Sequence, residues 1–185
     1  MWSKAAMILC ASMLAAAASA APPLRSEGGS VVAVADGALI RYRGWLLALD
    51  GAQADTAADV RLLSASRTQA ARVQAGKLQR DLPVWAAVEL AKDGTRLRIT
   101  ALPGLAAGGP AALLLDFGAG DYRIVIPASS LARHEHGLLA QHYPGADLAL
   151  LLQEETRVML PLGTAKLQVF GREQAAPYLF SKVRR

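Results

Sequence analysis

Short apolar runs, separated by glycine and by Asp-Gly pairs, are the dominant pattern along the chain. Residues 30–35 and 38–42 flank Asp36-Gly37, and an Asp-Gly pair between two apolar runs is typical of a two-residue β-hairpin turn. Further apolar runs predict strands at residues 45–49, 58–63, 84–87, 96–102, 111–117, 122–126 and 147–152. These runs therefore predict a series of short strands that glycine and Asp-Gly turns separate.

Two segments have helical character. Residues 68–78 predict a short helix, and residues 129–142 predict a second one that Ser129 or Ser130 would cap at its N-terminus. Strands that begin as hairpins and then alternate with helices are typical of α/β folds. The sequence therefore predicts an α/β fold, a layered sandwich of mixed β-sheets flanked by helices, in one domain over residues 30–185.

The first twenty residues have the features of a secretory signal peptide. Lys4 provides a positive start, residues 5–18 are apolar, and Ala18-Ser19-Ala20 provides the small residues of a cleavage site. A membrane span is the alternative, but the apolar run is shorter than the roughly 20 residues that a bilayer core requires. We therefore expect a flexible leader at residues 21–29, a mature chain without a transmembrane segment, and a periplasmic or secreted location.

Cysteine and charge narrow the chemistry of the mature chain. The one cysteine, Cys10, lies in the predicted signal peptide, and the bulky Leu9 before it is a poor fit to a lipoprotein signal. Disulfides, thiolate nucleophiles and Cys-ligated zinc are therefore not expected after cleavage. Loss of Lys4 leaves 19 basic side chains against 15 acidic ones, without a dense basic cluster, so nucleic-acid binding is not expected.

Several segments, in the same order along the chain, resemble those of one enzyme superfamily. They are residues 41–50, 59–64, 78–84, 97–104, 122–126 and 143–151, and the last reads Tyr-Pro-Gly-Ala-Asp-Leu-Ala-Leu-Leu. Together they resemble the metallo-β-lactamase-fold superfamily, in particular its lactonase-like hydrolase branch, over most of residues 30–160. The resemblance implies a sandwich of two sheets with flanking helices, and in active members a site with one or two metal ions.

The resemblance also implies that the metal ligands are missing. The positions of the histidines in the family's His-x-His-x-Asp-His loop fall on Ala65, Arg67 and Ala70, and that of its aspartate falls on Gln69. The later ligand positions fall on Ala106, near Ser129 and near Leu152. Methyl groups, an amide and a guanidinium do not form a zinc site, and the charge of Arg67 would repel a cation. We therefore expect no metal, no cofactor and no catalytic residue of the family's type.

Other candidate residues have simpler explanations. His134, His136 and His142 lie on the predicted helix at spacings that do not suit one metal ion, so a solvated helix face is the favoured interpretation. Ser129-Ser130 lacks a Gly-x-Ser-x-Gly elbow. The glycine-rich residues 103–110 lack the Lys-Ser/Thr of a phosphate-binding loop. Glu154 and Glu155 are adjacent on a strand and point to opposite faces.

Three hypotheses follow. The first is an exported, non-catalytic binding or scaffolding protein of the cell envelope, whose vestigial pocket, lined by Arg67, Gln69 and Ser129, holds a small anionic ligand or whose surface meets an envelope protein. The second is a metal-dependent hydrolase with a non-standard site, completed by the helix histidines or by a partner subunit. The third is a small envelope domain outside this superfamily.

Overall fold

The computed structural model describes residues 28–34, 37–50, 57–63, 70–105, 111–128, 131, 133–152, 156–161, 168–171 and 177–181. The predicted signal peptide and most of the predicted leader lie outside these residues. So do Arg67, Gln69 and Ser129, and the positions of Ala65 and Ala106.

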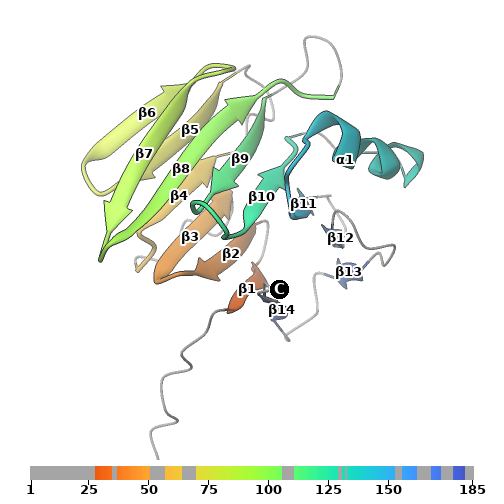
Figure 1. The fold of residues 1–185 in the computed structure, drawn as a ribbon, viewed down its shortest axis with the longest axis horizontal. Helices are drawn as coiled ribbons and strands as arrows, with labels where there is room; N and C mark the ends of the chain where they lie inside the picture. Colours follow the sequence, from red (N-terminus) through yellow and green to blue (C-terminus); the bar gives the residue numbers. More distant parts are fainter. Residues whose placement is uncertain are drawn as a thin grey trace, which may run out of the picture.

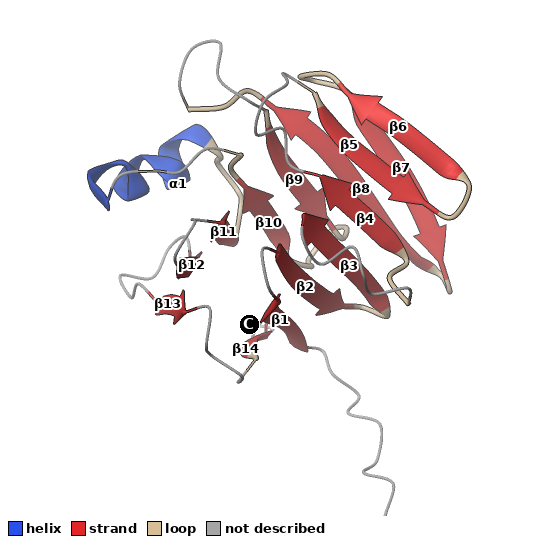
Figure 2. Ribbon diagram, turned by 180° about the vertical axis from the view of Figure 1, so that it is seen from behind, coloured by secondary structure: helices blue, strands red, loops and turns tan. Residues whose placement is uncertain are grey.

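The described residues form two seven-stranded sheets (Figures 1 and 2). Sheet A has the strand order β14-β1-β2-β3-β4-β5-β6, and sheet B has the order β13-β12-β11-β10-β9-β8-β7. The strands of sheet A are β1 (Gly28–Val34), β2 (Gly37–Tyr42), β3 (Trp45–Asp50), β4 (Val60–Leu63), β5 (Ala71–Ala75), β6 (Leu78–Leu82) and β14 (Tyr178–Ser181). Those of sheet B are β7 (Ala87–Lys92), β8 (Thr95–Leu102), β9 (Ala112–Asp116), β10 (Arg123–Ile126), β11 (Leu148–Leu152), β12 (Thr156–Pro161) and β13 (Gln168–Gly171).

One apolar core lies between the two sheets. Alternate residues of several strands are buried in it, for example Ile40 and Tyr42 of sheet A and Ile99 and Leu115 of sheet B. Successive side chains of a strand point to opposite faces, so the residues between these core positions face outward. The sheets therefore pack face to face as a sandwich.

Helix is scarce in the described residues. A 3₁₀ helix, η2 (Arg133–Leu138), runs into a single turn of α-helix, α1 (Leu139–His142), and lies beside β11 (Figure 1). Leu139 and Tyr143 pack on the outer face of sheet B against Ala112, Val125 and Ala149. The predicted α/β sandwich flanked by helices is therefore wrong: the described chain is mainly β-structure, and this one short segment covers part of one sheet. Neither η2 nor α1 has the length of a bilayer-spanning helix.

The helix predicted at residues 68–78 is also wrong. Residues 71–75 form β5, which pairs antiparallel with β6. Ala71 and Val73 are buried while Arg72 and Gln74 are exposed, and this period of two suits a strand. Gly76, with a φ of 55°, turns the chain between the two strands.

The first hairpin is confirmed. β1 and β2 pair antiparallel with Val34 opposite Gly37, and the two residues between them lie outside the described residues. β2 and β3 form a second hairpin through Arg43 and Gly44, which both have positive φ. Positive φ at both central residues matches the turn type that follows the right-handed twist of strands.

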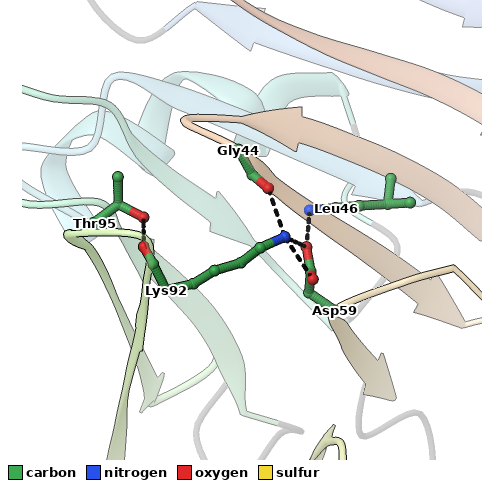
Figure 3. Close-up of polar contacts among 5 residues, drawn as sticks. All are labelled: Gly44, Leu46, Asp59, Lys92 and Thr95. Carbon is green, nitrogen blue, oxygen red and sulfur yellow. Dashed lines mark hydrogen bonds and ion pairs between the residues drawn. The ribbon is translucent and has the colours of Figure 1, made fainter.

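Lys92 is one of the side chains that connect the two sheets, and it lies at an edge of the sandwich (Figure 3). Lys92, the last residue of β7 in sheet B, donates to both carboxylate oxygens of Asp59, at 2.7 and 2.8 Å, and to the carbonyl oxygen of Gly44 at 3.0 Å. Asp59 and Gly44 belong to sheet A, one just before β4 and the other in the β2–β3 turn. A charge-assisted contact therefore fixes the position of β7 relative to sheet A.

Candidate binding site

An exposed tryptophan in a strained conformation marks the first candidate site. Trp85 lies in the turn between β6 and β7, is 72% exposed, and has a φ of 73°. Positive φ is unfavourable for a bulky L-residue and costs on the order of 1–3 kcal/mol. Strain at an exposed aromatic residue is a signal of function, because stability alone would place a glycine there.

Backbone hydrogen bonds hold Trp85 in this conformation. The N–H of Ala86 donates to the carbonyl oxygen of Pro83 at 2.9 Å, which closes a four-residue turn with Trp85 in third place. The third residue of a type II turn requires positive φ and is usually glycine. The N–H of Trp85 donates to Ala101 at 2.7 Å, and the N–H of Ala101 donates to Ala86 at 2.9 Å, so the turn is also anchored to β8.

A pocket of about 390 Å³ lies beside this tryptophan. Its walls come from the end of β8 and the two residues after it, from β9, and from the end of α1. The lining residues are Trp85, Leu102, Pro103, Gly104, Leu114, His142, Tyr143 and Pro144. We call this space the Trp85 pocket.

Tyr143 fixes the two sides of the Trp85 pocket relative to each other. It is buried, and its hydroxyl donates to the carbonyl oxygen of Pro103 at 3.0 Å, which joins the end of α1 to the end of β8. Burial raises the pKa of Tyr143 to about 12, so the hydroxyl stays protonated and keeps donating at neutral pH. The pocket is therefore preformed, apolar over most of its wall, and provided with one imidazole at its rim.

The predicted helix histidines do not come together. His134 is exposed on η2, His136 is partly buried there, and His142 is exposed at the end of α1 and lines the Trp85 pocket. The Nε2 atom of His136 is buried and has no hydrogen-bond partner among the described residues. The prediction of a solvated face is therefore wrong for His136. Within the described ranges, no group of three or more His, Cys, Asp or Glu side chains could hold a metal ion.

A second hollow, on the outer face of sheet A, has a volume of about 600 Å³. It runs across the ends of four strands and includes three glycines and two arginines. Its lining residues are Gly28, Gly29, Ser30, Arg41, Tyr42, Arg43, Gly44, Trp45, Leu46, Leu179 and Phe180. We call it the Arg41 groove.

The sequence did not single out either hollow. Trp85 lies in the strand predicted at residues 84–87. The sequence signal for a turn at this place is Pro83, two positions before Trp85, since Pro favours turn positions. Arg41 belongs to the predicted strand at residues 38–42 and to the segment that resembles the metallo-β-lactamase fold, and neither prediction assigns it a binding role.

Comparisons with known proteins give no relative. No family model, no curated protein and no solved structure matches the chain. The resemblance to the metallo-β-lactamase-fold superfamily therefore stays a prediction from the sequence, and the site must be interpreted from its own geometry.

Proposed function

We propose that this chain is an exported, non-catalytic binding protein of the cell envelope, periplasmic or secreted, and that its ligand binds in the Trp85 pocket. The observation that carries the proposal is the combination of exposure and positive φ at Trp85. The chain keeps a strained turn whose effect is to present an indole ring beside an apolar hollow.

The pocket chemistry suits a small, neutral, flat ligand. The indole of Trp85 offers a face for stacking, and Leu102, Leu114 and Pro144 offer apolar wall. The hydroxyl of Tyr143 is already bonded to Pro103, so the imidazole of His142 and the indole N–H of Trp85 are the polar side-chain groups left to orient a ligand. A volume of about 390 Å³ is in the range of small-molecule sites.

A neutral two-ring probe tests this proposal. 2-Naphthol is titrated into ¹⁵N-labelled protein, and the indole N–H signal of Trp85 is identified by its absence from Trp85→Gly. We expect this signal to shift, and Trp85→Gly to weaken binding at least about tenfold, the size of a lost ring contact of 1.4 kcal/mol. Leu179→Ser is the matched control, because Leu179 is 73% exposed and lies outside the pocket. Equal affinity of wild type and Trp85→Gly for 2-naphthol would refute the proposal.

Metal content separates this function from the competing one, a metal-dependent hydrolase completed by the helix histidines or by a partner subunit. Elemental mass spectrometry is performed on untagged protein, and substoichiometric metal is expected. One equivalent of zinc that disappears in both His134→Ala and His142→Ala would favour the hydrolase.

The proposed anionic ligand at Arg67, Gln69 and Ser129 has its own test. These residues lie outside the described ranges, and the proposal rests on the sequence alone. If Arg67→Ala left the binding of small anions unchanged, this detail would be discarded.

A further inference from the structure

The outer face of sheet B carries a row of charges that neutralise one another. The row crosses neighbouring strands at directly opposed positions and consists of Glu89, Arg98, Asp116 and Arg123, with Asp147 next to Arg123. Arg98 lies 3.7 Å from Glu89, and Arg123 lies 3.0 Å from Asp116. Each cation in this row therefore has an anion on the neighbouring strand.

Sheet A has a row at the corresponding place, but its composition differs. Directly opposed positions are Leu179, Ser30, Arg41 and Leu46, with Asp59 next to Leu46. Each row ends beside an aspartate, Asp59 or Asp147, whose carboxylate accepts the backbone N–H of the last residue of the row. The two rows can therefore be compared position by position. In sheet A the row has one cation, flanked by Ser30 and Leu46 instead of acidic side chains.

Arg41 makes no ion pair with any residue in the described part of the chain. The nearby carboxylates are already engaged: Asp59 is bound by Lys92, and Asp121 is bound by Arg43 at 2.7 Å. Among the described residues, the Arg41 groove therefore contains one guanidinium without an acidic partner, that of Arg41, and one with such a partner, that of Arg43.

The surroundings of Arg41 combine this charge with apolar surface. Leu179 is two strands away on the same face and is 73% exposed, whereas Leu46 on the neighbouring strand is buried. The hydroxyl of Ser30 lies between Arg41 and Leu179 in the row. An exposed large apolar residue two strands from a guanidinium that has no ion pair among the described residues suits a ligand with one anionic group and a short apolar tail.

We propose that the Arg41 groove binds a soluble amphiphile with a single carboxylate, held at Arg41, whose apolar tail lies along Ser30 and Leu179. Arg41 is the residue that selects the anionic group, since a guanidinium can hold both oxygens of a carboxylate. This site is separate from the Trp85 pocket, with which it shares no lining residue.

Calorimetric titration with decanoate, below the concentration at which it forms micelles, tests the proposal. The variants are Arg41→Gln and, as a control with the same charge change on the outer face of sheet B, Arg98→Gln. We expect Arg41→Gln to weaken decanoate binding at least about tenfold and Arg98→Gln to change it less than about twofold, because a lost charge-assisted hydrogen bond outweighs a change in net charge. Leu179→Ser should weaken decanoate binding but not acetate binding.

Three outcomes would overturn the proposal. They are no binding of decanoate to the wild type, equal losses in Arg41→Gln and Arg98→Gln, or inorganic phosphate binding as tightly as decanoate. Repeating the titration in Trp85→Gly separates the two sites: decanoate affinity should be unchanged there. Trp45, which lines the Arg41 groove, is then the only tryptophan after residue 2 and reports binding by its fluorescence.

Discussion

Asp59 and Asp147 hold corresponding positions in the two sheets. The N–H of Asp59 donates to the carbonyl oxygen of Leu46, and its carboxylate accepts the N–H of Leu46, both at 2.8 Å. Asp147 makes the same two bonds with Arg123, at 2.8 and 2.9 Å. Each aspartate immediately precedes a strand, β4 or β11, that pairs parallel with its neighbour. A carboxylate at this point fixes the register of the only parallel pairing in each described sheet.

The contact of Asp59 with Lys92 adds stability that a surface ion pair does not. Both groups are largely shielded from solvent, with side-chain exposures of 24% and 35%. A double-mutant cycle with Asp59→Asn and Lys92→Met should give a coupling energy of about 1–2 kcal/mol in urea unfolding. Arg72 and Asp81 form an equally short but exposed ion pair, and the same cycle there should give a much smaller coupling. Similar values for both pairs would contradict this prediction.

Replacing Trp85 by glycine should stabilise the protein while it removes the binding face. Glycine adopts positive φ without strain, and the exposed ring contributes little burial, so the gain is expected to be about 1 kcal/mol, seen as a higher melting temperature. Trp85→Ala keeps a Cβ at the same φ and should show no such gain. A destabilised Trp85→Gly would mean that the indole is a structural element of the fold.

Gly29 is required by the packing of the last strand. A Cβ at Gly29 would overlap the ring of Phe180, its direct partner on β14, which also packs against Tyr42 and Tyr122. Gly29→Ala should therefore cost about 1–3 kcal/mol in unfolding free energy. Phe180→Leu should recover part of this loss in the double variant, and strictly additive effects would show that the overlap is not the cause.

The buried hydroxyl of Tyr143 predicts a loss of stability in alkali. Its pKa is about 12 in the folded protein and about 10 when unfolded, so its contribution is complete below pH 10 and is lost as the pH rises toward 12. At pH 11 the wild type should have lost about 1.4 kcal/mol relative to pH 8 through this one group. Tyr143→Phe lacks this loss, so the stability difference between the two proteins should change by that amount. A difference independent of pH would contradict the assigned pKa.

The parts of the fold that the sequence predicted are those with local signals. The apolar runs on either side of the predicted Asp36-Gly37 turn pair as the first hairpin, and the apolar runs at residues 45–49 and 122–126 correspond to β3 and β10. The helix predicted at residues 68–78 is wrong because alanine, arginine and glutamine favour helix in isolation, whereas pairing with β6 decides the conformation of β5. β12, β13 and β14 were not predicted.

The sites could not be read from the sequence, because each depends on contacts between distant segments. Trp85 acquires a pocket only when the end of α1 is joined to β8 by Tyr143 and Pro103. On β1 and β3, the residues directly opposite Arg41 are Ser30 and Leu46, neither of which is acidic, and this follows only from the pairing of the strands. Composition gives the number of arginines and not which of them lacks a partner.

The place of β14 has a consequence for biosynthesis. β14 pairs with β1, so residues 178–181 complete the sheet that residues 28–34 begin (Figure 2). Until the ribosome has added them, the backbone of β1 has one open edge, and Phe180 is missing from the aromatic cluster around Tyr42. Pairing between segments so far apart is slow to form. The free edge of β1 is therefore exposed to pairing with other strands until residues 178–181 have been made and have paired with it.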